Sequence, residues 1–364
     1  MSARPRLAIV IPTLHGAGAE RFLSEILPRL DEAFEIDLIL YAREIDYPVP
    51  PGVRVVILGS DTSAERSIPQ KGVRFASRVL GLARHLRAGR FDVVFGLVDM
   101  NNVVTWAAAR MADRGLPVVL AERTINENFF AFNPHARRMA RVMRPLLRLA
   151  YGRAERVVAL SQAMRRYLEG EFGVRRPAGR PMDVVENGVN LRAFFPPPDG
   201  AAMPDSLDER FRRATVRVLN VARLDDNKDQ AFLVDLFGDV RRAVPQAELF
   251  VIGVGPNEDA LRARITAAGL DGAVHLLGWR TDVPEYMRAA STFVLSSHHE
   301  GTPRTVIEAI ACGLPVVVTR STESLPDVLD GGLGSLVPVG DRAAFTAALV
   351  AALRERATDP AHRR

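Results

Sequence analysis

The chain has 364 residues, of which 48% are hydrophobic and 25% are charged. This length suits two domains of ordinary size, each with its own core. A single cysteine, Cys312, excludes an internal disulfide and favours a reducing compartment. The N-terminus is a poor signal peptide, and no run approaches the roughly 20 apolar residues that span a bilayer. We therefore expect a cytoplasmic protein.

The formal net charge of +5 is unevenly distributed along the chain. Residues 1–185 contain 28 Lys and Arg against 19 Asp and Glu, whereas the remainder contains 20 basic and 24 acidic residues. A basic half suits nucleic acid, an anionic acceptor or an acidic membrane surface. Because no nucleic-acid-binding module or aromatic stacking platform is recognisable, we do not expect nucleic acid as a partner.

In the first half of the chain, short apolar runs bounded by turn residues alternate with helical patterns. The expected strands are 7–11, 36–40, 53–58, 93–97, 118–121 and 157–160. The expected helices are 19–30, 73–88 and 135–151. Strands that alternate with helices predict a parallel sheet with helices on both faces, as in a Rossmann-like domain.

A proline-rich segment at 194–200 interrupts this pattern, which then restarts. The expected strands of the second half are 216–221, 248–252, 274–277, 292–295 and 316–319, and its expected helices are 229–243, 257–268, 282–290 and 303–312. The sequence predicts an α/β protein with doubly wound domains at 1–190 and 213–364, a linker at 191–212 and a cleft between the domains. Ligands of such sheets bind beyond the carboxyl ends of the strands.

The most informative stretch for chemistry is SSHHEGTPRTVIEAIACGLPVVV at 296–318. Thr302 predicts an N-cap and Pro303 the first position of a short helix, which ends before Gly313. The amides at the start of this helix, from Gly301 onwards, suit a diphosphate.

Two glutamates belong to the same stretch. Glu300 can accept hydrogen bonds from sugar hydroxyls, and Glu308 can bind two vicinal hydroxyls such as those of a ribose. The alternative interpretation is a capped surface helix with two solvated glutamates.

A second stretch, VLNVARLDDNKDQ at 218–230, carries Arg223 and Lys228 in the loop after a strand. Two cations at the carboxyl end of a strand can neutralise a leaving diphosphate without a metal. Each cation alone is more simply a solvated surface charge. No Asp-x-Asp site or Cys/His cluster is convincing, so we expect no metal.

The loop IPTLHGAGAE at 11–20 places Gly16 and Gly18 between the first strand and a helix. Glycines let the backbone approach a phosphate or sugar closely. The third glycine of the dinucleotide fingerprint is missing, and no acidic residue ends the second strand in a ribose-binding position. This pattern argues against a nicotinamide dehydrogenase.

These stretches, in this order, resemble the GT4 family of retaining glycosyltransferases, which has the GT-B fold. The signature is Glu300 and Glu308 with seven residues between them, followed by GLPVV at 313–317. The other matching pieces are ENGVN at 186–190, GVGP at 253–256 and LGWRTDVP at 277–284.

The resemblance implies transfer of a sugar from a nucleotide-diphosphate donor with retention of the anomeric configuration, without a metal or cofactor. It implies that Arg223 and Lys228 stabilise the leaving diphosphate and that Glu300 binds the transferred sugar. The implied donor-binding residues are Gly16, Gly18, Gly253, Trp279, Arg280, Gly301, Thr302, Pro303 and Glu308. A UDP-sugar is favoured over a GDP-sugar.

The chain departs from the family pattern in two places. Many members have a histidine after the fourth strand of the first domain, where this chain has Arg123. Arg123, Thr124 and Asn126 are therefore the candidate acceptor-side residues. The resemblance implies a glycan or lipid-linked acceptor in cell-surface glycan biosynthesis. Family chains usually continue past DPAHRR with a helix that crosses back onto the first domain, so we expect this chain to be either shortened or closed differently.

The segment 136–156 contains five arginines among apolar residues, Arg137, Arg138, Arg141, Arg144 and Arg148. It suits contact with the inner face of the plasma membrane, which a lipid-linked acceptor would require. The alternative is an ordinary packed helix with an arginine-rich outer face. We expect Pro145 to interrupt a single long helix here.

Two other functions remain open. A nucleotide-sugar 2-epimerase of the same fold would need acid and base groups that the sequence does not place. A non-catalytic binding protein of two domains would expect a secretion signal, and it gives no reason for Arg223 and Lys228 beside two glutamates. A transferase is favoured.

Overall fold

The structure is a computed structural model, which describes residues 4–15, 18–59, 68–123, 134–198 and 200–358. The chain divides into two compact units, Met1–Asn187 and Gly188–Arg364. The segment expected as a linker, 191–212, belongs to the second unit. Its side chains Phe194, Leu207 and Phe211 are buried in that unit's core, because they are apolar and find partners there.

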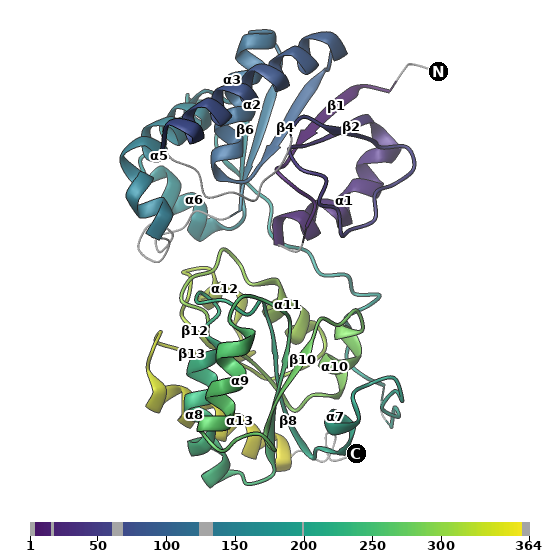
Figure 1. Ribbon diagram of the computed structural model, residues 1–364, viewed down its shortest axis with the longest axis vertical. Coiled ribbons are helices and arrows are strands. Elements are labelled where there is room, and N and C mark those ends of the chain that lie inside the picture. Colours follow the sequence, from purple (N-terminus) through teal and green to yellow (C-terminus); the bar gives the residue numbers. More distant parts are fainter. Residues whose placement is uncertain (1–3, 16–17, 60–67, 124–133, 199, 359–364) are drawn as a thin grey trace. The chain divides into compact units, whose positions relative to one another are not determined.

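The first unit is a seven-stranded sheet in the order β3-β2-β1-β4-β5-β6-β7, with every pairing parallel. Its elements are β1 (Arg6–Val10), α1 (Gly18–Ala33), β2 (Glu35–Leu40), β3 (Arg54–Ile57), α2 (Ile68–Gly89), β4 (Val93–Leu97), α3 (Asp99–Ala112), β5 (Val118–Glu122), α5 (Pro134–Arg153), β6 (Arg156–Ala159), α6 (Gln162–Glu169) and β7 (Asp183–Val184). Successive residues of a strand point to opposite faces of the sheet. Accordingly, Leu7 and Ile9 of β1 pack with α1, and Ala8 and Val10 pack with α2, α3 and α5 (Figure 1).

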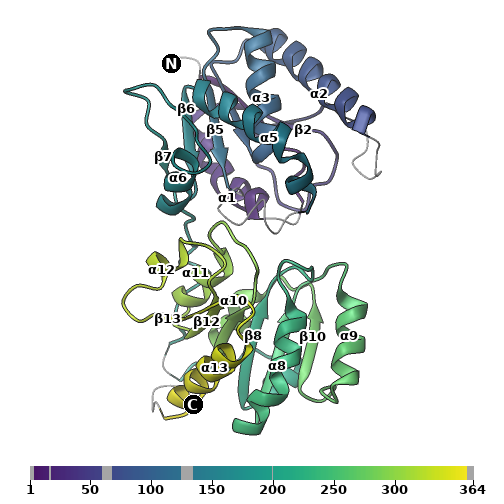
Figure 2. The same ribbon diagram turned by 90° about the vertical axis from the view of Figure 1, so that its left-hand side faces the viewer.

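The second unit is a six-stranded parallel sheet in the order β10-β9-β8-β11-β12-β13. Its elements are α7 (Glu209–Arg213), β8 (Val216–Val221), α8 (Gln230–Ala243), β9 (Ala247–Ile252), α9 (Glu258–Ala267), β10 (Val274–Gly278), α10 (Val283–Ala289), β11 (Thr292–Leu295), α11 (Arg304–Ala311), β12 (Val316–Thr319), α12 (Leu325–Val328), β13 (Gly334–Val337) and α13 (Arg342–Thr358). Helices α8, α9 and α13 cover one face, whereas α10, α11 and α12 cover the other (Figure 2).

The strand order of each sheet reverses beside the first strand of its unit. The reversal lies between β1 and β4 in the first unit and between β8 and β11 in the second. Open α/β sheets bind ligands at such a switch point, outside the carboxyl ends of the strands. The loops after these four strands are therefore where functional side chains are expected.

Helix α5 runs without a break through Pro145, so the predicted interruption was wrong. Proline removes the hydrogen bond to the carbonyl four residues earlier. Here both Pro145 and Arg141 are exposed, so water can satisfy that carbonyl. In the part of the chain that the structure describes, no helix combines the length and apolar character needed to cross a membrane.

Asp37 on β2 is buried and links the strand to β3 and α2. Arg54 donates from Nε to Asp37 Oδ1 at 2.9 Å, and His85 Nε2 lies 2.8 Å from Asp37 Oδ2. Burial alone would raise the pKa of Asp37. The hydrogen bonds from Arg54 and His85 outweigh burial and hold this pKa below its usual value.

We predict that Asp37→Asn lowers the free energy of unfolding by about 1–3 kcal/mol at pH 7, because hydrogen bonds to a buried charged group are lost. Since the folded-state pKa is lowered, the wild-type advantage is present above the unfolded-state pKa of about 3.9. The advantage is lost as the pH falls through the folded-state pKa. Urea denaturation at several pH values measures this difference, and one that does not shrink in acid would contradict the prediction.

Candidate functional site

The loops after β8 and β11 are joined through the side chain of Asn227. Its Oδ1 accepts a hydrogen bond from the His299 N–H at 3.1 Å, and its Nδ2 donates to the His299 carbonyl at 3.0 Å. The His298 N–H donates to the Asn227 carbonyl at 2.8 Å. These three hydrogen bonds fix the position of one loop against the other. The next residue of each loop, Lys228 in one and Glu300 in the other, therefore lies close to its counterpart.

Lys228 and Glu300 form an ion pair at this switch point. Both lie in loops that follow strands, as predicted from the sequence. Lys228 Nζ donates to Glu300 Oε1, and Ser297 Oγ donates to the same oxygen at 2.7 Å. The two side chains are only 22% and 11% exposed, so solvent screens the pair weakly. An ammonium has three N–H donors, so this bond leaves Lys228 able to serve a further acceptor.

Arg223 lies at the start of the same loop and reaches solvent. Its side chain is 67% exposed, and its Nε lies 3.6 Å from Asp225 Oδ2. Gln230 Nε2 donates to the Arg223 carbonyl at 2.9 Å and fixes the backbone at this point. The loop after β8 therefore presents one partly buried cation and one exposed cation.

Helix α11 begins at Arg304, just after Glu300. Pro303 is its N-cap, and no side chain caps the helix. The prediction that Thr302 is the N-cap was wrong, because the Thr302 hydroxyl donates to Ser324 Oγ at 3.2 Å instead. Gly313 follows the helix with a φ of 75°, as its predicted position requires.

Loop 321–324, after β12, holds the turn that precedes α11. The Glu300 N–H donates to the Ser321 carbonyl at 3.0 Å. The Gly301 carbonyl accepts from Ser324 Oγ at 2.9 Å and from Thr322 Oγ1 at 3.2 Å. The backbone around Glu300 is thus fixed on two sides, by the β8 loop and by the β12 loop.

Glu308 lies in the middle of α11 and is 1% exposed. Its Oε1 is 4.0 Å from Arg304 Nη2, and Arg304 is itself nearly buried. Charged side chains are rarely buried unless they are paired or serve a function. The structure therefore places a buried charge pair next to the turn that carries Glu300.

The loop after β9 passes over the β8 loop at two glycines. A Cβ at Gly253 would lie 2.0 Å from the Ala222 carbonyl oxygen, and one at Gly255 would lie 2.2 Å from the Leu224 carbonyl oxygen. Gly253 also has a φ of 142°, which other residues rarely adopt. Glycine at both positions is therefore required for these two backbones to approach each other.

Trp279 and Arg280 follow β10 and differ in their surroundings. Trp279 is 61% exposed, so its indole is available to a flat apolar ligand. Arg280 Nη2 lies 3.6 Å from Asp208 Oδ2, and its guanidinium lies 5.9 Å from the centre of the Tyr286 ring. Arg280 is thus held by Asp208 at the start of α7.

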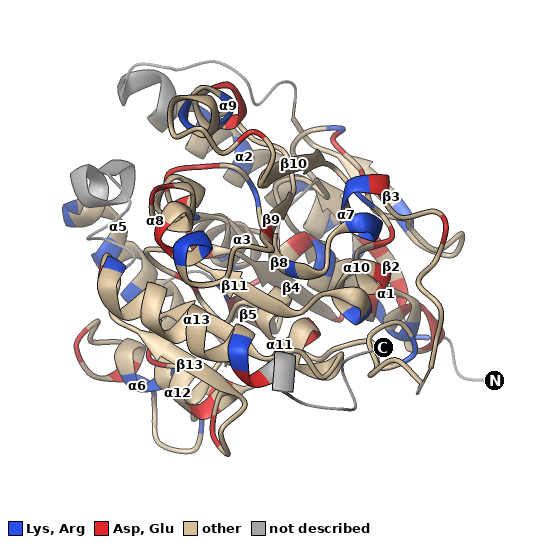
Figure 3. Cartoon of the chain, turned by 90° about the horizontal axis from the view of Figure 1, so that it is seen from below, with Lys and Arg blue, Asp and Glu red and all other residues tan. Residues whose placement is uncertain are grey.

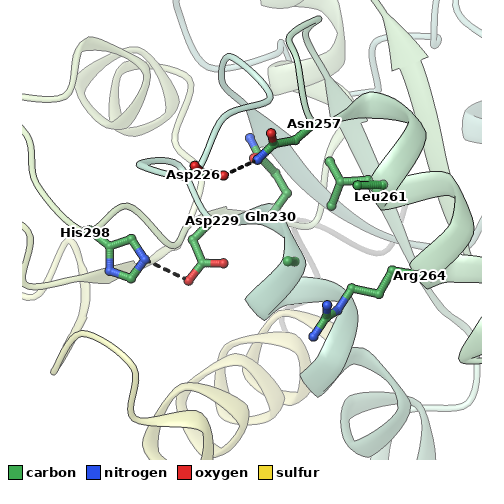
Figure 4. Close-up of a pocket in the computed structure, with 9 residues that line it drawn as sticks. Asp226, Asp229, Gln230, Asn257, Leu261, Arg264 and His298 are labelled. Atoms are coloured by element: carbon green, nitrogen blue, oxygen red, sulfur yellow. Dashed lines mark hydrogen bonds and ion pairs between the residues drawn. The ribbon is translucent and has the colours of Figure 1, made fainter. Parts of the chain in front are cut away.

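A pocket of about 310 Å³ adjoins the β8 loop (Figure 4). It is lined by Asp226, Asp229, Gln230, Ala231, Asn257, Ala260, Leu261, Arg264 and His298. Asn257 Nδ2 donates to Asp226 Oδ1 at 2.7 Å, and His298 Nε2 lies 3.1 Å from Asp229 Oδ2. Neither this pocket nor the role of Asn227 was predicted, because the only signal for them in the sequence is their position in loops at the carboxyl ends of strands.

Two family models match the chain, one in each unit. Residues 16–193 match the model described as Glycosyltransferase Family 4, and residues 215–355 match the model described as Glycosyl transferases group 1. The chain belongs to the GT4-like glycosyltransferases. The predicted transferase function is confirmed, and the epimerase alternative gains no support.

Curated relatives of this glycosyltransferase are also transferases. It is 26% identical over 336 residues to the N-acetylgalactosamine-N,N'-diacetylbacillosaminyl-diphospho-undecaprenol 4-alpha-N-acetylgalactosaminyltransferase of Campylobacter jejuni, with 92% of this chain and 86% of the relative covered. It is 25% identical over 278 residues to the UDP-Gal:alpha-D-GlcNAc-diphosphoundecaprenol alpha-1,3-galactosyltransferase of Escherichia coli, with 75% and 69% covered.

Solved structures confirm the predicted GT-B fold. Sucrose-phosphate synthase from Thermosynechococcus elongatus superposes with a TM-score of 0.77 at 17% identity, over 99% of this chain and 91% of that chain. Alr3699/HepE of Anabaena, solved in complex with UDP, superposes with a TM-score of 0.72 at 20% identity, over 98% and 92%.

The predicted residues of the glycosyltransferase's first unit are placed in part. Arg123 follows β5, is 8% exposed, lies 3.6 Å from the centre of the Phe22 ring and donates to the Asn187 side chain. Gly18 begins α1, and a Cβ there would meet nothing within 4 Å. Gly16, Thr124 and Asn126 lie outside the described residues.

The described residues of the glycosyltransferase contain no group of three or more His, Cys, Asp or Glu side chains that could hold a metal ion. His299, beside Glu300, has its pKa lowered by burial. Burial likewise raises the pKa of the Cys312 thiol to about 11, so Cys312 is a poor nucleophile.

We predict that Gly255→Ala lowers the free energy of unfolding by about 1–3 kcal/mol, as overpacking does. The new Cβ would meet backbone atoms of Leu224 within 2.7 Å, and backbone cannot rotate away. Gly238→Ala in α8 is the matched control, because a Cβ there meets nothing within 4 Å. The control should stabilise by about 0.5–1 kcal/mol. Thermal unfolding compares the two variants, and an unchanged melting temperature for Gly255→Ala would contradict the close approach.

Proposed function

We propose that this glycosyltransferase takes a UDP-sugar donor at the carboxyl ends of the second unit's strands. The observation that carries the proposal is the Lys228–Glu300 pair, which Asn227 positions at the β8–β11 switch point. A diphosphate bound there would contact the partly buried ammonium of Lys228, which has further N–H donors, and the exposed guanidinium of Arg223. The UDP complex of Alr3699/HepE and the UDP-Gal donor named for the E. coli relative support the uridine nucleotide.

The proposed reaction retains the anomeric configuration and needs no metal. The bond between the sugar C1 and the diphosphate oxygen breaks, and its electrons leave with the diphosphate. The acceptor hydroxyl oxygen bonds to C1 on the same face, and its proton passes to a phosphate oxygen. Lys228 and Arg223 stabilise the charge that develops on the diphosphate, and such stabilisation accelerates the chemical step.

The two glutamates would divide the remaining contacts to the donor. Glu300 accepts a hydrogen bond from Lys228 and would also accept hydrogen bonds from hydroxyls of the transferred sugar. Glu308, buried beside Arg304, would bind the ribose hydroxyls. The exposed Trp279 would lie against the nucleotide base, since its indole offers an open apolar face.

The acceptor that we propose is a glycan on a lipid diphosphate, and the proposed location is the inner face of the plasma membrane. Both curated relatives above carry diphospho-undecaprenol in their names. Helix α5 buries Met143 and Leu147, but Val142 and Leu149 on its outer side are 52% and 41% exposed. Arginines recur along this helix (Figure 3), and apolar side chains among arginines suit an anionic lipid surface.

We predict that UDP binds the purified protein in calorimetry with EDTA present, and that GDP and ADP bind more weakly. Glu308→Ala should weaken UDP binding at least roughly tenfold, because the lost hydrogen bonds are made by a charged group. Lys228→Met should lower kcat by about 10²–10³ and change UDP affinity less, as for other groups that stabilise developing charge. Lys71→Met, at the chain's other lysine, is the control. Full turnover in Lys228→Met, or no nucleotide binding by the wild type, would rule out the proposed site.

We predict that Val142→Glu with Leu149→Glu reduces binding to vesicles of phosphatidylglycerol and phosphatidylcholine, because charges replace apolar contacts at an anionic surface. Co-sedimentation should show a loss of about tenfold, equal to roughly 1.4 kcal/mol. Val73→Glu changes another exposed apolar residue of the first unit and should bind as wild type does. Equal binding by all three proteins would exclude this face of α5.

A further inference from the structure

The switch point of the first unit, between β1 and β4, holds a strained residue. Val98, directly after β4, has a φ of 73°, and a β-branched side chain rarely adopts this conformation. Such conformations persist where the surrounding structure enforces them, often at ligand sites. The strain alone identifies no ligand, but polar side chains at this end of the sheet do carry such information.

Asn101 lies in the first turn of α3, which follows Val98. Its Nδ2 donates to the Val10 carbonyl at 2.8 Å and to the Leu97 carbonyl at 2.9 Å, so it ties the ends of β1 and β4 together. The residue is 7% exposed, and its Oδ1 is buried without a hydrogen-bond partner. Buried acceptors are almost always satisfied in folded proteins, so this oxygen requires an explanation.

Glu20 presents a second acceptor of the same kind at the start of α1, which follows β1. It is 9% exposed, and burial raises its pKa, while its own backbone N–H acts in the opposite direction. Its Oε2 is buried without a partner. The titratable group that acts on it is His15 of the preceding loop, which lies 2.6 Å from Asp46. A carboxylate oxygen left in this state destabilises the folded protein.

We propose that Glu20 Oε2 and Asn101 Oδ1 accept hydrogen bonds from hydroxyl groups of a sugar substrate. When Glu20 is ionised both atoms are acceptors, so the ligand has to supply donors, and the carboxylate would repel a phosphate. Neutral hydroxyls fit both requirements. Sites that leave polar groups unpaired until the hydroxyl arrives discriminate strongly against ligands that lack it. This inference rests on the proposed function and names the part of the substrate that the first unit binds.

Glu20→Gln tests the proposal with little change of shape. Glutamine keeps the shape of glutamate, but it has no negative charge and an NH₂ group in place of one carboxylate oxygen. The substrate hydroxyl then loses a charged acceptor. We expect transfer from UDP-sugars to a synthetic GlcNAc-diphospho-lipid in detergent to fall by about tenfold to a hundredfold in kcat/KM. Glu25→Gln, at an exposed glutamate of the same helix, is the control and should transfer normally.

Two assays identify which substrate carries the hydroxyl. Hydrolysis of the UDP-sugar in the absence of acceptor uses only the donor. If hydrolysis is retained while transfer is lost, the hydroxyl belongs to the acceptor; if both fall and KM for the donor rises, it belongs to the donor sugar. Transfer by Glu20→Gln at the wild-type rate would overturn the proposal.

Stability separates this role from a structural one. Burial raises the pKa of Glu20, so the stability that this group contributes is present below its unfolded-state pKa and lost as the pH rises through its folded-state pKa. Glu20→Gln should therefore melt at the same or a higher temperature than wild type at pH 8, with a gain that shrinks in acid. A lower melting temperature together with lost transfer would show that Glu20 only supports the fold. This comparison needs no substrate, so it stands even if the wild type transfers no sugar and the proposed function fails.

Discussion

The site in the second unit depends on the pairing of the Asn227 side chain with the backbone of His299. The loops at the carboxyl end of a parallel sheet have no ladder, so their backbone groups need partners of another kind. The side-chain amide of Asn227 supplies both a donor and an acceptor to the His299 backbone, as a neighbouring strand would do. An ion pair between two mobile loops would gain little free energy, because ordering the two side chains costs conformational entropy. With the loops already fixed, Lys228 and Glu300 meet at a lower entropic cost.

Much of the fold was predictable from the sequence. Strands β8, β11 and β12 were predicted to the residue, because each is a short buried run between turn residues. Helix α3 was missed, since Val103, Val104 and Thr105 are poor helix formers. All three are buried in this helix, which packs against α2 and α5. Burial against neighbouring helices thus outweighs local helix propensity here. The local sequence pattern does not show that these residues will be buried.

The candidate site was predictable where charge and loop position mark it, as at Arg223, Lys228 and Glu300. Asn227 and Ser296 were missed, because they act through hydrogen bonds to backbone in other loops. Ser296 Oγ, for example, lies 2.8 Å from the Lys228 carbonyl, across a separation of 68 residues. The Thr302 cap was predicted wrongly for the same reason, since its competitor Ser324 is remote in sequence. Side chains that position a site through hydrogen bonds to residues far away in the sequence produce no periodic pattern, so the sequence does not reveal them.

Both switch points leave buried acceptors without a hydrogen-bond partner, and in the second unit these are Asn220 Oδ1 and Gln230 Oε1. At β8–β11 the side chains of Lys228 and Glu300 already form an ion pair, so the proposed diphosphate would enter a site whose geometry is set. At β1–β4 the buried atoms without a hydrogen-bond partner include Glu20 Oε2 and Asn101 Oδ1. A ligand that supplies hydroxyls recovers the free energy lost there, and one without hydroxyls does not. In the proposed reaction, preorganised charge suits the second unit to the leaving group, and the two unpaired acceptors of the first unit suit it to a sugar hydroxyl.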